Sequence, residues 1–166
     1  MTNAPPQVAI RPAEPQDVGL ILTLIKELAE YERLADKVVA TEKSLHATLF
    51  GPQSAAEVLI AESGDAALGF ASFFVNYSTF LGRTGLYMED VYVRPPARGQ
   101  GIGRLLLVKV AQAAVARGCH RLEWAVLDWN MPAIGFYQRL GATPLDEWTT
   151  YQLSSEALQR LAADGG

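Results

Sequence analysis

A glycine-rich turn between an expected strand and an expected helix constrains the fold of this 166-residue chain more than any other feature. Residues 85–93 are rich in aromatic and β-branched side chains, and residues 101–117 repeat apolar side chains at helical spacing. Between them lie two prolines and the sequence Arg98-Gly-Gln-Gly-Ile-Gly103. Glycines let a ligand approach the backbone closely, and the N–H groups at a helix start attract anions. The segment therefore predicts a cradle for a pyrophosphate.

The spacing of the glycines narrows the kind of pyrophosphate ligand. The chain has no Gly-x-x-x-x-Gly-Lys-Ser/Thr sequence, which a nucleotide-triphosphate loop requires. Its Gly99-x-Gly101-x-Gly103 spacing differs from the dinucleotide fingerprint and comes late in the chain, after an expected meander. What remains is Arg/Gln-x-x-Gly-x-Gly/Ala after a strand, which resembles the pyrophosphate-binding motif of the GNAT superfamily. The alternative is a flexible glycine turn without a ligand.

The rest of the chain predicts one α+β domain over residues 1–166, with residues 1–7 as a flexible N-terminus. Hydrophobic periodicity predicts helices over 15–33, 41–50 and 101–117, and strands over 8–11, 57–62, 67–75, 85–93 and 122–127. Asn130 is expected to cap a short helix that ends at Gly141. A last strand over 147–153 and a helix over 154–162 complete the expected order. We expect a mixed, mostly antiparallel central sheet with helices on both faces.

Composition and charge limit the class of protein. The hydrophobic fraction of 49% and charged fraction of 19% are typical of a globular chain. A single cysteine, Cys119, cannot form an internal disulfide, and no export signal or membrane span is apparent, so we expect a cytoplasmic protein. The net charge of −4 argues against nucleic acid as a partner.

The charge is unevenly distributed. Residues 1–80 hold ten acidic and five basic residues, whereas the segment 94–121 holds six basic residues and no acidic one. This pattern suits a cationic acceptor and a polyanionic cofactor, although charge alone favours the alternative of a solvated helix face. His46 and His120 have no ligand-like spacing with each other or with Cys119, so we predict no metal.

Six ordered blocks of sequence, from about residue 8 to the C-terminus, resemble the diamine acetyltransferase family. That GNAT group includes spermidine/spermine acetyltransferase and its thialysine-acetylating relative. The blocks are Ile10-Arg-Pro, Ile25-Lys-Glu-Leu-Ala-Glu-Tyr-Glu32, Tyr87-Met-Glu-Asp90, Arg98-Gly-Gln-Gly-Ile-Gly103, Asp128-Trp-Asn130 and Phe136-Tyr-x-x-x-Gly-Ala142. The resemblance implies a GNAT fold whose splayed strands bind acetyl-CoA, and direct attack of an amine on the thioester in a ternary complex. It also implies a homodimer that binds neither nucleic acid nor membrane.

The resemblance also assigns the cofactor-binding residues. Backbone N–H groups near Val91, Tyr92 and Val93 are expected to hold the thioester carbonyl. The pantetheine arm is expected to lie along Asn130, Ala133 and Tyr137. The amides expected to meet the phosphates are those of Arg98, Gly99, Gln100, Gly101, Ile102, Gly103 and Arg104.

Two residues are predicted to be catalytic by the same resemblance. Tyr137 matches the general acid that protonates the departing thiolate, and its alternative is an aromatic side chain packed beside Phe136. Glu89 is expected to assist deprotonation of the amine, and Asp90 to hold the acceptor. Because neighbours on a strand alternate, we expect the two carboxylates on opposite faces. The alternative is that one is solvated and the other pairs with an arginine.

The acceptor is expected to contact Tyr31, Glu32, Glu123 and Trp124, since a carboxylate and an aromatic face both favour a cation. The alternative is a surface helix end and ordinary packing. Ser78 stands where the polyamine enzyme has an acidic residue, so a lysine- or thialysine-like amine is as plausible as a polyamine. A protein amine as acceptor, or a non-catalytic acetyl-CoA sensor, are the competing hypotheses.

Overall fold

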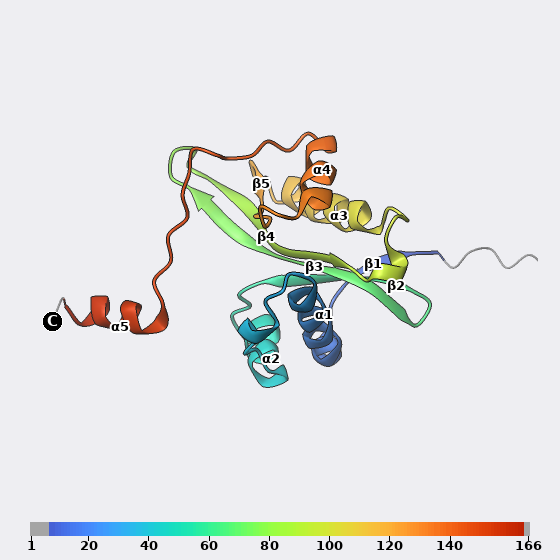
Figure 1. Cartoon of the computed structure of the whole chain (residues 1–166), viewed down its shortest axis with the longest axis horizontal. Helices are drawn as coiled ribbons and strands as arrows, with labels where there is room; N and C mark the ends of the chain where they lie inside the picture. Colours follow the sequence, from blue (N-terminus) through green and yellow to red (C-terminus); the bar gives the residue numbers. More distant parts are fainter. Residues whose placement is uncertain (1–6, 165–166) are drawn as a thin grey trace, which may run out of the picture. The chain divides into compact units, whose positions relative to one another are not determined.

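The computed structural model describes residues 7–164, and Figure 1 traces its helices and strands. The chain divides into a first unit that ends at Leu127 and a second that begins at Asp128. The predicted flexible N-terminus lies outside the described residues, apart from Gln7.

A five-stranded sheet forms the centre of the first unit, in the order β1-β2-β3-β4-β5. The pairings from β1 to β4 are antiparallel, and β5 runs parallel to β4. The mixed, mostly antiparallel sheet predicted from the sequence is thereby confirmed. The strands are β1 (Ala9–Pro12), β2 (Glu57–Ser63), β3 (Ala66–Ser78), β4 (Arg83–Val93) and β5 (Leu122–Glu123).

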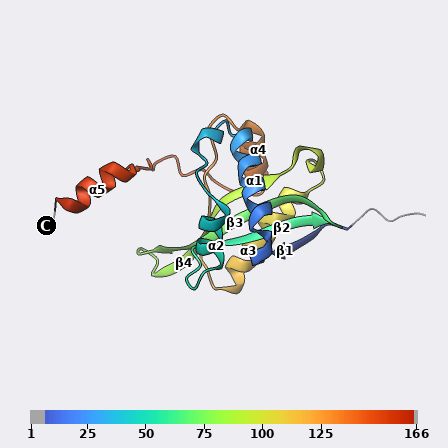
Figure 2. The ribbon, with the colours of Figure 1, turned by 90° about the horizontal axis from the view of Figure 1, so that it is seen from below.

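Helices cover both faces of this sheet, α1 and α2 on one face and α3 on the other (Figure 1). Figure 2, seen from the side of α1 and α2, shows these two helices in front of the strands. The helices are α1 (Val18–Tyr31), α2 (Glu42–Phe50) and α3 (Ile102–Ala116), and short 3-10 turns span Pro15–Asp17, Ala35–Lys37 and Pro95–Ala97.

The core lies between α1 and the sheet. Apolar side chains at helical spacing on α1 meet alternate residues of three strands, as an amphipathic helix on a sheet requires. The cluster contains Ile21, Leu24, Leu28, Val58, Ile60, Phe70 and Tyr92. On α3, the residues Ile102, Leu106 and Val110 are fully buried. The sheet is thus packed on both faces, and β4 lies within it between β3 and β5.

Several predicted element ends are confirmed by their local chemistry. Thr41 caps α2 by accepting the Ser44 N–H at 3.1 Å, and α2 ends before Gly51. The β2–β3 hairpin turns at Gly64, whose φ is 58°. Gly118 ends the helix of α3 with φ 67°. Such signals act over a few residues, so the sequence is sufficient to predict them.

The second unit contains α4 (Met131–Arg139) and α5 (Ser155–Ala163). The predicted cap is present, since Asn130 Oδ1 accepts the Ala133 N–H at 3.4 Å. The predicted strand over 147–153 is wrong: these residues form no regular structure, and Trp148 and Tyr151 are 75% and 91% exposed. Strand propensity forms a strand only beside a pairing partner, and the described part of this unit contains no strand.

The strand predicted over 122–127 is also shorter than expected. Only Leu122 and Glu123 pair, with Leu86 and Tyr87 of β4. Just beyond that point β4 carries a β-bulge, where the register shifts between the Ser72–Asp90 and Phe73–Met88 pairs. A bulge bends the strand and interrupts its ladder. Pairing with β5 therefore ends where β4 changes course, and the rest of β4 has an open edge.

Candidate active site

The glycine loop between β4 and α3 contains a run of N–H groups without backbone acceptors among the described residues. Among the described residues, the amides of residues 99–104 have no backbone acceptor, and the first helical bond runs from Leu105 N to Gly101 O at 3.0 Å. Gly99 and Gly101 adopt φ of 76° and 80°, and a Cβ on either would meet no atom within 4 Å. The loop therefore leaves open room beside unpaired donors at a helix start, which is the geometry that a phosphate group needs.

Arg98 differs from the rest of the predicted phosphate loop. Its N–H already bonds Pro95 O at 3.2 Å, and its Nε donates to Val93 O at 2.8 Å. Its guanidinium carbon lies 4.6 Å from the centre of the Tyr31 ring. The backbone donor of Arg98 is therefore engaged within the protein.

The open edge of β4 also carries unpaired amides. Arg94 N donates to Leu68 O at 2.8 Å, so the Arg94 amide points toward β3. Backbone groups alternate in direction along a strand, which turns the N–H groups of Val93 and Val91 away from β3. Tyr92 pairs with Phe70, and its N–H belongs to the β3–β4 ladder. Of the three predicted thioester contacts, Val91 and Val93 thus have amides at the open edge and Tyr92 does not.

The prediction that Glu89 and Asp90 point to opposite faces of the sheet is wrong. Ser72 pairs with Asp90 and Phe73 with Met88, which leaves Glu89 as the unpaired residue of the bulge. Glu89 stands two positions after Tyr87 and so shares its face, and the Tyr87 ring lies 5.3 Å from that of Phe74. Asp90 accepts a hydrogen bond from Ser72 Oγ at 2.7 Å, on the same side of β3 as Phe74. The bulge therefore brings both carboxylates to the face that α1 covers.

Asp90 acts electrostatically on two further carboxylates, those of Glu32 and Glu89, and we call the three residues the carboxylate cluster. Burial and the neighbouring Asp90 raise the pKa of both Glu32 and Glu89. Burial raises the pKa of Asp90, against the opposing effect of the Ser72 hydrogen bond. Within residues 7–164 none of the three forms an ion pair. Carboxylates that lie close together without a counter-charge attract a cation.

Glu123 approaches the same face from β5, where it pairs in register with Tyr87. Its charge is partly balanced, because Arg121 Nε lies 2.8 Å away and Asn76 Nδ2 donates to it at 2.8 Å. The pKa of Tyr87 is raised by burial, then by Glu89 and Glu123. Sequence reasoning assigned Tyr87 no role, although its position two residues before Glu89 was a usable signal. Trp124 follows β5 directly and is half-buried.

Asn130, Ala133 and Tyr137 belong to the second unit. Asn130 is 7% exposed and caps α4, on whose last turns Tyr137 lies with its ring 5.4 Å from that of Phe136. The placement of these residues beside acetyl-CoA stays a prediction.

Three of the six basic residues in segment 94–121 form ion pairs within the first unit. Arg94 pairs with Glu27 at 2.8 Å, and Arg117 and Arg121 pair with Glu57 and Glu123. Among the described residues Arg104 and Lys109 have no acidic partner. No three His, Cys, Asp or Glu side chains in residues 7–164 are arranged so that they could hold a metal ion together, and no helix in that range is long and apolar enough to cross a membrane.

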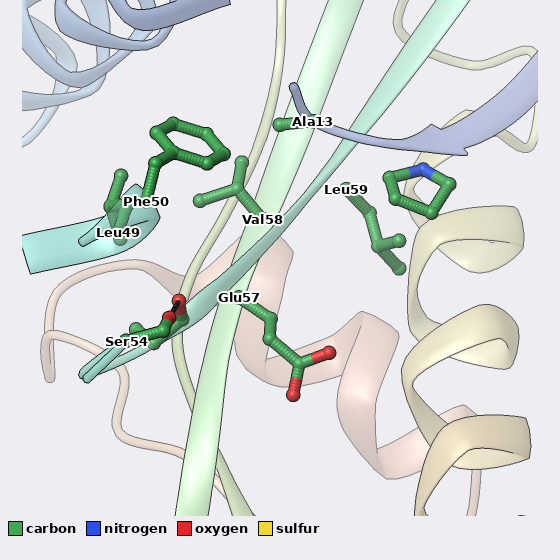
Figure 3. A pocket seen from close by; sticks show the side chains of 9 residues that line it. Ala13, Leu49, Phe50, Ser54, Glu57, Val58 and Leu59 are labelled. Carbon is green, nitrogen blue, oxygen red and sulfur yellow. Dashed lines mark hydrogen bonds between the residues drawn. The ribbon is translucent and has the colours of Figure 1, made fainter. Parts of the chain in front are cut away.

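A cavity of about 250 Å³ lies apart from the predicted site (Figure 3). Its walls come from β2, the end of α2 and the residues after β1, and they are mostly apolar. The carboxylate of Glu57 at its rim is bound by Arg117 Nη2 at 2.7 Å. None of the predicted site residues lines this cavity.

Comparison with known proteins identifies the family. Residues 22–142 match the model of the acetyltransferase (GNAT) family. The chain is 43% identical to the thialysine N-epsilon-acetyltransferase of Bos taurus, over 93% of this chain and 97% of the relative. It is 36% identical to an L-ornithine N5-acetyltransferase of Arabidopsis thaliana, over 92% of this chain and 86% of the relative. An integron cassette protein from the mobile metagenome of V. cholerae has the same fold, with TM-score 0.79, 30% identity and coverage of 93% and 97%. The chain belongs to the GNAT acetyltransferase family.

Proposed function

We propose that this acetyltransferase moves the acetyl group of acetyl-CoA onto the side-chain amine of a lysine-like amino acid. The observation that carries the proposal is the cluster of Glu32, Glu89 and Asp90, two members of which lie on the strand that also has an open edge of unpaired amides. A cation-attracting face and a carbonyl-binding edge thus share β4.

The donor side of the proposal rests on the glycine loop and the open edge of β4. Acetyl-CoA, when bound, supplies the acetyl group as an activated thioester. The free amides of residues 99–104 fit its pyrophosphate, and Arg104 adds a positive charge that has no acidic partner among the described residues. The amides of Val91 and Val93 are placed to hold a carbonyl oxygen, as two donors at one edge can.

The acceptor side rests on the carboxylates. An ammonium group must lose a proton before it can attack a carbonyl. Glu89 lies on the bulge and has a raised pKa, which makes it a stronger base than an ordinary carboxylate. Asp90 and Glu32 attract and orient the amine, together with Tyr31, Glu123 and Trp124. The amine attacks the thioester carbonyl directly. Tyr137 donates a proton to the thiolate of CoA as it departs.

The amine class follows from the relatives and from one loop. Thialysine and ornithine, named in two relatives, are amino acids with a primary amine at the end of the side chain. The tip of the β3–β4 hairpin carries Ser78 and no carboxylate between Tyr77 and Gly82. A polyamine is the second candidate, favoured by the fourth carboxylate, Glu123, on the same face.

The remaining proposals concern assembly and location. The family model spans residues on both sides of Leu127, which supports one catalytic domain made of both units. We propose a homodimer, supported by the exposed apolar side chains of Trp148, Tyr151 and Leu153. The single cysteine supports a cytoplasmic location. Sedimentation velocity tests the dimer.

The function is tested by incubating the purified chain with acetyl-CoA and single amines while the release of free CoA is followed. The panel contains thialysine, lysine, ornithine, spermidine, putrescine, an aminoglycoside and a short peptide. Release with the amino acids alone supports the proposal, and release with the polyamines alone favours the second candidate. Release of CoA with the peptide alone contradicts both candidates. The absence of CoA release with every amine in the panel also contradicts both.

A further inference from the structure

Arg98 lies between the two predicted binding regions of the first unit. It opens the glycine loop, yet its side chain contacts α1 and β4. The guanidinium carbon is 4.6 Å from the centre of the Tyr31 ring and 5.7 Å from that of Tyr92. Its Nε donates to Val93 O at 2.8 Å. Arg98 therefore joins the loop, the last residue of α1 and the end of β4.

Each of the two rings lies next to a carboxylate of the acceptor face. Tyr31 is followed directly by Glu32, and Tyr92 stands two positions after Asp90 on the same face of β4. Because Arg98 contacts both rings, the end of α1 lies close to β4, and the effect of Asp90 on the pKa of Glu32 agrees with this. A cation stacked on both rings fixes how α1 ends against β4.

Arg104, in the same segment, is an arginine without an ion pair among the described residues. It is exposed on the first turn of α3, and within residues 7–164 no acidic side chain pairs with it. Arg98 has its backbone N–H and its Nε engaged within the protein. The contrast assigns charge attraction for a phosphate to Arg104 and a structural link to Arg98.

We infer that Arg98 is a positioning residue that couples the glycine loop to the acceptor face by holding Tyr31, and with it Glu32, in place for the amine. The inference rests on the proposed function. A ligand that orders the loop also fixes Arg98, so acetyl-CoA and the amine strengthen each other's binding, and this coupling is reciprocal. Loss of the Arg98 side chain then weakens amine binding through Tyr31.

The test is a double-mutant cycle of Arg98→Leu and Tyr31→Leu, with Arg104→Leu as the matched arginine. Calorimetry measures the Kd of acetyl-CoA, and steady-state kinetics measures the KM of thialysine. Each single leucine variant of the stacked pair is expected to raise the amine KM by about 2- to 30-fold, the range that a cation–π contact supplies. The double variant is expected to be no worse than either single variant. Tyr31→Phe keeps the ring that Arg98 contacts and is expected to raise the KM less than Tyr31→Leu does.

Arg104→Leu is expected to raise the Kd of acetyl-CoA and leave the amine KM unchanged. The inference is overturned if Arg98→Leu behaves in that way instead, or if the effects of Arg98→Leu and Tyr31→Leu on KM simply multiply. If the unmodified protein releases no CoA with any amine, the proposed function fails separately. The free energies of unfolding of the same variants, measured in urea, then test whether Arg98 and Tyr31 interact. Additive effects of the two substitutions would overturn the inferred contact, and non-additive effects would support it.

Discussion

Glu89 is the residue whose proposed role a pH profile isolates most directly. Its pKa is raised by burial and by Asp90, so it gains a proton at a higher pH than an ordinary carboxylate. Because only the ionised form accepts a proton, kcat/KM for the amine should fall as the pH drops through that raised pKa, above the usual value of about 4.3. We expect Glu89→Gln to lower kcat by about 10²- to 10⁴-fold and to abolish this acidic limb.

Glu30→Gln is the matched control for Glu89→Gln. Glu30 is exposed on α1, and its substitution removes the same charge from a residue outside the carboxylate cluster. We expect kcat and the shape of the pH profile to stay unchanged in this variant. An acidic limb that persists in Glu89→Gln would assign proton acceptance to another group.

Tyr137 and Tyr151 form a second matched pair, both in the second unit. Tyr137 lies on α4, whereas Tyr151 is 91% exposed in the segment without regular structure. If Tyr137 protonates the thiolate, Tyr137→Phe should lower kcat by about 10²- to 10⁴-fold. Acetyl-CoA should still raise the melting temperature of that variant, and Tyr151→Phe should keep full turnover. Unchanged kcat in Tyr137→Phe would remove the phenol from the mechanism.

Two glycines test how closely the elements around β4 are packed. A Cβ at Gly69 of β3 would overlap the backbone carbonyl of Tyr92, which cannot move without disturbing the sheet. We expect Gly69→Ala to destabilise the protein by about 1–3 kcal/mol or more, as overpacking does. A Cβ at Gly103 would lie 3.7 Å from Val93 Cγ2, an ordinary contact. Gly103→Ala should therefore stabilise α3 by about 0.5–1 kcal/mol, because alanine has a higher helix propensity than glycine. Urea unfolding without ligand measures both, and equal effects would contradict this packing.

The elements that the sequence predicts correctly are those whose ends depend on local signals, and the ones it predicts wrongly depend on non-local strand pairing. Thr41, Gly118 and Asn130 carry the signals that begin or end their helices, and all three are found where expected. The segment 147–153 has strand propensity but no partner, and 124–127 loses its partner at the bulge. The bulge itself inserts one residue without a compositional signal. For that reason the glycine loop was predictable from sequence, whereas the shared face of Glu89 and Asp90 was not.

For the whole molecule, Asp17 and the three residues of the carboxylate cluster have opposite effects on the pH dependence of stability. The pKa of Asp17 is lowered, first by its hydrogen bond to Arg11. Its stabilising contribution is present above the unfolded pKa and is lost as the pH falls through the folded one. Glu32, Glu89 and Asp90 have raised pKa values. Their contribution is complete below the unfolded pKa and is lost as the pH rises through the folded values. Between mildly acidic and neutral pH, this cluster therefore lowers stability.

A variant with Glu32→Gln and Asp90→Asn tests this opposition. Both substitutions keep the size of the side chain, and the amide introduced at position 90 can still bond Ser72. At neutral pH the double variant should melt higher than the unmodified protein, by roughly 2–4 °C for each kcal/mol of repulsion removed. At mildly acidic pH the difference should shrink, because the carboxyls are then partly protonated. Equal differences at both pH values would show that the cluster does not limit stability.

The same repulsion links stability to the proposed acceptor. A bound ammonium supplies the positive charge that the three carboxylates lack, and a ligand that binds only the folded state raises its stability. Thialysine should therefore raise the melting temperature of the unmodified protein more at neutral than at mildly acidic pH. The variant with Glu32→Gln and Asp90→Asn should lose most of this rise, whereas Glu30→Gln should keep it. Thermal unfolding with and without the amine measures all three proteins. A rise that is equal in the three would place the amine away from the cluster and would remove the observation on which the acceptor proposal rests.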